Sequence, residues 1–141
     1  MSHSASASAP AGTVVVPLKR ILLTLARSKE HPQGSSRHGY EIVAPLDAAG
    51  RLDPQAWKHV RQSCKVRRFW AGEADDIGHL VHRPGGAGGA TWTFDYDETT
   101  IDDDEAGFRL GEPVLAPGEY VSVRDDDEVW HTFKVEWVKD A

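Results

Sequence analysis

The sequence VWHTFKVEWV, residues 129–138, decides the fold class, because apolar and polar side chains alternate along it with a period of two. Successive side chains of a β-strand point to opposite faces of the sheet, so this alternation predicts a strand with one face in a core. The residues expected on that inner face are Val129, His131, Phe133, Val135 and Trp137.

A hairpin is expected earlier in the same half of the chain. The segments IGHLVHR (residues 77–83) and ATWTFDYD (residues 90–97) flank the glycine-rich run PGGAGG as two strands flank their connecting loop. This run lacks the Lys-Ser/Thr pair of a nucleotide-binding loop, and no helix follows it. It therefore predicts a hairpin loop and not a phosphate site.

The pattern of residues 18–27 fits either a helix or a strand. We favour a strand, because residues 39–46 (GYEIVAPL) also read as a strand that can pair with it. The connection between them, residues 28–38, is polar and long for a hairpin. Connections of this kind are often mobile or functional.

One helix is strongly indicated after residue 53. Asp53 is a good N-cap residue and Pro54 suits the first helical position. Trp57, Val60 and Cys64 then follow at spacings of three and four residues, which places them on one side of a helix. This side is expected to face the core.

Short strands separated by Gly/Pro corners, together with one helix, define the predicted fold class. We expect a mainly β (α+β) protein: a small antiparallel β-barrel or roll with one α-helix packed at one end. Residues 1–12, rich in Ser and Ala, are predicted to be a disordered leader. Residues 13–141 are predicted to form a single globular β-rich domain.

Cysteine content and hydropathy favour a cytoplasmic location. Cys64 is the only cysteine, so the chain has no intramolecular disulfide and no thiolate-rich zinc site. The N-terminus lacks the basic start and apolar run of a signal peptide, and residues 21–26 are too short to cross a bilayer. We therefore expect no membrane partner.

The charges are divided unevenly along the chain. Residues 1–70 hold 11 Lys and Arg against 4 Asp and Glu, whereas residues 71–141 hold 5 against 18, and the formal net charge is −6. The two halves are expected to pack together and pair their charges. The alternative is a basic patch that meets an anion or an acidic rim that meets a cation.

The best candidate for a binding site is the basic and aromatic run WKHVRQSCKVRRFW, residues 57–70. Arginine pairs with phosphate or carboxylate groups, and aromatic rings offer surfaces for stacking. The tentative binding residues are Arg61, Lys65, Arg67, Arg68 and Trp70. Pairing of these cations with the acidic half is the stronger interpretation, because consecutive Arg67 and Arg68 point to opposite sides of a strand.

Candidate metal ligands are weak, and neither a metal nor another cofactor is predicted. The three histidines His79, His82 and His131 would have to converge, but a spacing of three sends His79 and His82 to opposite faces of a strand. The acidic loop fails the calcium pattern, because Ala106 and Pro113 stand where oxygen ligands are needed. Its carboxylates remain weak candidates for cation attraction: Asp102, Asp103, Asp104 and Glu105.

Three stretches resemble a family of small uncharacterised bacterial proteins. They are HGYEIVAPLD, CKVRRFWAGEADDIGHLVHR and PGEYVSV, at residues 38–47, 64–83 and 117–123. The resemblance covers nearly the whole chain after the leader. It implies a free-standing bacterial domain and assigns no activity to any residue.

These observations favour a binding protein over an enzyme. The leading hypothesis is a non-catalytic binding or interaction domain that presents a charged face to an anionic small molecule or a partner protein. One alternative is a metal-dependent hydrolase that uses His79, His82 and His131. Another is nucleic-acid binding through residues 57–70, against which the negative net charge argues.

Overall fold

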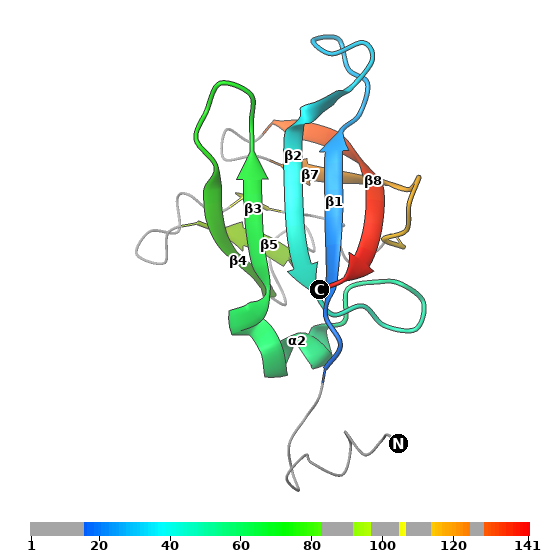
Figure 1. Ribbon diagram of the computed structural model, residues 1–141, viewed down its shortest axis with the longest axis vertical. Coiled ribbons are helices and arrows are strands. Elements are labelled where there is room, and N and C mark those ends of the chain that lie inside the picture. The colour runs from blue at the N-terminus through cyan, green and yellow to red at the C-terminus, as the bar shows by residue number, and fades with distance from the viewer. Residues whose placement is uncertain (1–15, 83–91, 97–104, 107–113, 125–128) are drawn as a thin grey trace, which may run out of the picture.

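The computed structural model describes residues 16–82, 92–96, 105–106, 114–124 and 129–141. These residues form eight antiparallel strands and one short helix (Figure 1). The strands are β1 (Lys19–Leu25), β2 (Ser35–Ala44), β3 (Lys65–Phe69), β4 (Asp76–His82), β5 (Trp92–Asp95), β6 (Glu105–Ala106), β7 (Tyr120–Arg124) and β8 (Trp130–Asp140). The helix α2 (Pro54–Val60) continues into the 3₁₀ turn η1 (Arg61–Ser63).

The strands pair in sequence order and the sheet closes into a barrel, because β1 pairs with both β2 and β8. Among the described residues, the least continuous side lies at β6, where two residues are in the strand and one position pairs with β7. The predicted class, a small antiparallel β-barrel with one helix, is confirmed. Residues 18–27 contain the strand β1, as favoured, and β2 begins at Ser35, four residues before the expected start.

The helix lies at one end of the barrel, as predicted (Figure 1). The Asp53 carboxylate accepts hydrogen bonds from the backbone N–H groups of Gln55 and Ala56, and Pro54 occupies the first turn. Trp57 is buried, and its indole N–H donates to the Leu80 carbonyl at 2.9 Å. The helix is thereby fixed to β4. Among the described residues, no helix has the length and apolar character needed to cross a membrane.

Three aromatic rings from different strands fill the centre of the barrel. Tyr40 of β2 lies 4.9 Å from Phe94 of β5 and 5.1 Å from Phe133 of β8, measured between ring centroids. All three side chains are essentially inaccessible to solvent. Small barrels are commonly filled by their own side chains in this way. A ligand site is therefore to be sought on the outside of the sheet.

The expected inner face of residues 129–138 needs one correction. Phe133 and Val135 are buried as predicted, but Val129 lies before β8 and is exposed. Trp137 is opposite Leu22 while Val135 is opposite Leu23, so one extra residue, Glu136, interrupts the alternation as a β-bulge. Trp137 consequently lies on the outer face. A strict period of two does not reveal such a bulge.

Substitution of Gly39 by Ala is expected to destabilise the barrel strongly. A Cβ atom at this position would lie 1.9 Å from the Leu23 carbonyl oxygen and 2.9 Å from the Phe69 ring, so the strands would have to separate. Overpacking of this kind costs roughly 3 kcal/mol. Chemical denaturation of Gly39→Ala measures this loss directly.

The matched control is Gly118→Ala. Gly118 has a positive φ of 91° but open space around the position of a Cβ atom, so backbone strain alone should cost about 1–2 kcal/mol. Equal losses in the two variants would contradict the close approach of β1 and β2 at Gly39.

Candidate functional site

The five residues singled out in the basic run do not form one surface. Arg61 follows α2 at the helix end of the barrel, and Lys65 begins β3 beside it. Arg68 and Trp70 lie at the other end of β3. Arg61 and Lys65 are exposed, whereas the remaining three residues are half-buried.

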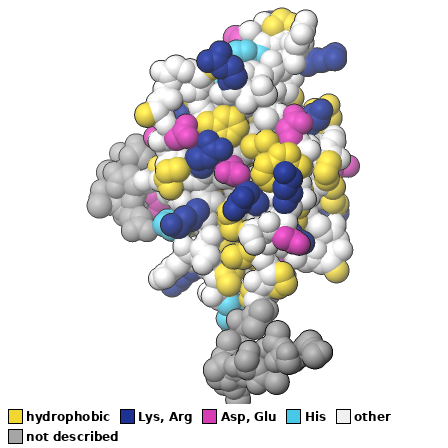
Figure 2. Space-filling view, viewed as in Figure 1, with side chains coloured by type: hydrophobic (Ala, Val, Ile, Leu, Met, Phe, Trp, Pro, Cys, Tyr) yellow, Lys and Arg dark blue, Asp and Glu magenta, His cyan; other side chains and the backbone are white. Residues whose placement is uncertain are grey.

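Arg67 lies within a network of ion pairs on the outer face of β1, β2 and β3. Its guanidinium is 3.4 Å from the Glu41 carboxylate and 3.0 Å from the Asp75 carboxylate, and it covers the ring of Phe69. Glu41 is also 3.9 Å from Arg20. Figure 2 shows this face, on which cationic and anionic side chains alternate. The charge of Arg67 is therefore compensated within the protein.

Arg68 points to the other side of the strand, as predicted. It pairs with Glu73 at 3.2 Å and Asp76 at 3.6 Å, and its guanidinium lies 4.5 Å from the centre of the Trp70 ring. The partners of Arg67 and Arg68 include three carboxylates from the acidic half of the chain. These contacts agree with the prediction that the two halves pair their charges.

The structure does not bring the three candidate histidines together. His82 packs against Trp57 and Trp92 at the helix end of the barrel, with centroid distances of 6.0 and 4.7 Å. His131 lies at the opposite end, 5.8 Å from Trp70. His79 and His82 are three residues apart on β4, so their side chains point to opposite faces of the sheet. This arrangement gives no support to a metal site built from the three.

The acidic candidates Asp102, Asp103 and Asp104 lie outside the described residues, and Glu105 belongs to β6. Within the described ranges, no group of three His, Cys, Asp or Glu side chains is placed to hold a metal ion.

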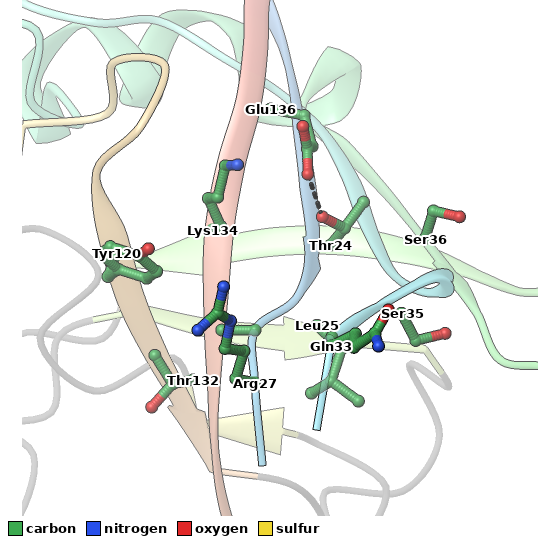
Figure 3. A pocket seen from close by; sticks show the side chains of 12 residues that line it. Thr24, Leu25, Arg27, Gln33, Ser35, Ser36, Tyr120, Thr132, Lys134 and Glu136 are labelled. Atoms are coloured by element: carbon green, nitrogen blue, oxygen red, sulfur yellow. Dashed lines mark hydrogen bonds between the residues drawn. The ribbon is translucent and has the colours of Figure 1, made fainter. Parts of the chain in front are cut away.

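A groove on the outer side of β1, β7 and β8 is the candidate site (Figure 3). It is open to solvent, and its volume of about 930 Å³ lies toward the upper end of the roughly 300–1,000 Å³ typical of ligand sites. Polar side chains dominate the lining. They are Thr24, Arg27, Gln33, Ser35, Ser36, Tyr120, Thr132, Lys134 and Glu136.

The floor of the groove comes from the pairing of β1 with β8. Thr24 is opposite Lys134 in this pairing, and the Thr24 hydroxyl donates to the Glu136 carboxylate at 2.6 Å. Glu136 is the extra residue of the bulge in β8. Bulges often redirect a side chain next to a binding site. In this barrel, Glu136 lies on the same surface as Lys134, and the bulge turns Trp137 to the outer face as well.

One wall of the groove is the connection between β1 and β2, residues 26–34. The Ala26 N–H donates to the Thr132 carbonyl at 2.9 Å, which ties the start of the connection to β8. The Gly34 N–H donates to the His31 carbonyl at 2.9 Å, closing a turn. Gly34 has a positive φ of 75°, a conformation that glycine adopts without strain. These contacts hold the wall above the sheet.

Two cations approach the groove from different elements. Arg27 belongs to the wall and Lys134 to β8, and in Figure 3 both lie between Tyr120 on one side and Gln33 on the other. Among the residues that the structure describes, neither cation has an ion-pair partner. Glu136 contributes one negative charge, so the described lining keeps an excess of positive charge.

The sequence pointed to part of this site. The polar connection of residues 28–38 was noted as long enough to be functional, and it supplies Gln33, Ser35 and Ser36. Lys134 and Glu136 were missed, because they read as the solvent side of a strand. Their proximity to Arg27 depends on the pairing of β1 with β8, for which the sequence carries no local signal.

Comparison with models of protein families, with curated proteins and with solved structures finds no match to this chain.

Two histidines at the ends of the barrel have a lowered pKa. Burial is the main cause at both His38 and His82. At His38 the pKa is lowered further by the neighbouring charges of His31, Arg37 and Arg68, and raised in part by Glu73. At His82 the additional cause is Lys58. The native state therefore favours neutral imidazole at both positions.

The free energy of unfolding is accordingly expected to decrease as the pH falls below about 6.5. The unfolded chain binds protons at these histidines at a higher pH than the native state does, so acidification favours unfolding. Urea titrations between pH 7.5 and 5.5 measure the slope. The double variant His38→Gln, His82→Gln should have a shallower slope, whatever its stability at neutral pH. An unchanged slope would contradict this assignment.

Cys64 is expected to be inert in the native protein. It is fully buried, its Sγ contacts the Val60 carbonyl, and burial raises the pKa of its thiol to about 11. Because the thiolate is the reactive form, a disulfide reagent at pH 8 should label the native protein at least about a hundredfold more slowly than the protein in guanidinium chloride. Comparable labelling rates would show that Cys64 is accessible.

Proposed function

We propose that this protein is a non-catalytic binding domain, and that it holds an anionic ligand in the groove beside β1 and β8. The observation that carries the proposal is the pair Arg27 and Lys134. Each reaches the groove, and neither has an ion-pair partner among the described residues. Arg67, by contrast, already lies close to two carboxylates.

The groove differs in charge from the protein as a whole. With a formal net charge of −6, the protein as a whole repels anions. Salt screens the charges on more distant parts of the surface. An anion near the groove therefore responds mainly to the local excess of positive charge. Arginine adds a planar pair of donors that matches a carboxylate or phosphate group.

The lining suits binding better than acid–base catalysis. Its described polar side chains are hydroxyls, one amide, two cations and Glu136, whose carboxylate already accepts a hydrogen bond from Thr24. A general base needs a group that takes up and releases a proton near the working pH. His38 and His82, whose pKa values are lowered by burial, are packed into the ends of the barrel and do not line the groove.

Replacement of Arg27 or Lys134 by Ala is expected to weaken anion binding by about tenfold or more, because a hydrogen bond to a charged group contributes roughly 1.5–3 kcal/mol. Isothermal titration calorimetry at low salt, with inorganic phosphate, citrate and tetragalacturonate as probes, measures the change. Two-dimensional NMR of the amide groups should show the largest shifts near Gln33 and Thr132.

Lys65→Ala is the matched control. It removes one positive charge from the basic run of residues 57–70 and lies outside the groove lining. We expect it to bind the same probes as tightly as the unmodified protein. If Lys65→Ala weakened binding as much as Arg27→Ala, the ligand would lie on the basic run and the groove would be the wrong site.

A further inference from the structure

The groove is lined by groups that both donate and accept hydrogen bonds. Hydroxyls are contributed by β1, β2, β7 and β8, and the amide of Gln33 also lines the groove. A hydroxyl can satisfy a partner hydroxyl in either direction. An ionised carboxylate accepts hydrogen bonds and donates none, so by itself it leaves the acceptor capacity of these hydroxyls unused. The remaining lining calls for a ligand that carries many hydroxyls of its own.

Tyr120 adds an aromatic surface at the edge of the same groove. It is opposite Lys134 in the pairing of β7 with β8, and 58% of its surface is exposed. Among the described residues, it is the most exposed of the large hydrophobic side chains, so one face of its ring is open to a ligand. The face of an aromatic ring carries partial negative charge and attracts the weakly positive C–H groups of a sugar ring.

The position of the groove argues against a peptide. β1 pairs with β2 and β8, and β8 pairs with β1 and β7, so the strands of the floor have both edges occupied. An extended peptide usually binds by adding a strand to an open edge. A chain lying across β1 and β8 therefore meets side chains and finds no free backbone groups of these two strands with which to form a ladder.

The charges argue against a nucleic acid. Nucleic-acid affinity comes mainly from several cations that meet successive phosphates. This groove has two cations and one carboxylate, Glu136, which would face a phosphate backbone. A carboxylate is, however, a suitable acceptor for the hydroxyls of a sugar.

On this basis, and resting on the proposed function, we infer that the ligand is an acidic oligosaccharide, a chain of sugar rings that carry carboxylate groups. A sugar carboxylate pairs with Arg27 and Lys134. The ring hydroxyls bind Gln33, Glu136 and the hydroxyl side chains, and the apolar face of one ring stacks on Tyr120.

The test compares three probes of similar length by isothermal titration calorimetry. Tetragalacturonate carries sugar rings and carboxylates, maltotetraose carries sugar rings alone, and tetraglutamate carries carboxylates alone. We expect tetragalacturonate to bind at least tenfold more tightly than either of the other two.

Two variants of Tyr120 separate stacking from a general loss of structure. Tyr120→Ala should weaken tetragalacturonate binding by about tenfold, the effect expected for loss of a stacked ring. Tyr120→Phe keeps the ring and should weaken it less than threefold. Because Tyr120 is exposed, both variants should unfold at the temperature of the unmodified protein.

The possible outcomes distinguish this inference from the proposed function. If tetraglutamate binds as tightly as tetragalacturonate and Tyr120→Ala has no effect, the ligand is an anion of another class, and the proposed function stands without the saccharide. If maltotetraose binds as tightly as tetragalacturonate, the carboxylate groups do not contribute to binding, and the inference that the saccharide is acidic is wrong. If none of the three probes and neither phosphate nor citrate binds, both proposals are overturned.

Discussion

The pairing of β1 with β8 is the constraint on which both the barrel and its groove depend. β1 is hydrogen-bonded along both edges, and closure against β8 leaves no open edge on that side of the sheet. The same pairing brings Thr24 to Glu136 and Ala26 to Thr132. The contacts that close the barrel therefore also form the floor of the groove and hold one of its walls. A change that weakened closure would distort the groove as well.

Local patterns in the sequence were enough to predict the class of fold. Asp53 and Pro54 marked the start of the helix, because capping depends only on nearby residues. The alternation around Phe94 and Phe133 marked strands, because burial on one face imposes a period of two. Neither signal depends on which strand pairs with which. Strand order and closure were accordingly left open by the sequence.

The groove could not be predicted for the same physical reason. Arg27 and Lys134 are more than a hundred residues apart, and they line one surface only because of a particular register between β1 and β8. The bulge at Glu136 breaks the period of two at the point where the groove forms. The cations of the basic run lie close together in sequence, which predicted a binding surface there. In the folded chain, Arg67 and Arg68 pair with carboxylates that the sequence alone did not assign to them.

The position of β1 and β8 at opposite ends of the strand order has a consequence for how the chain reaches its final form. β1 and β2 are consecutive strands and can associate early, whereas Lys19 contacts Asp140 across 121 positions of sequence. Bringing such distant segments together directly would cost about 4 kcal/mol of chain entropy. When the intervening hairpins form first, the loop that remains to be closed is shorter. The pairing of β1 with β8 therefore costs the least chain entropy when it forms last. During synthesis, β1 must wait with one edge open until β8 has been made.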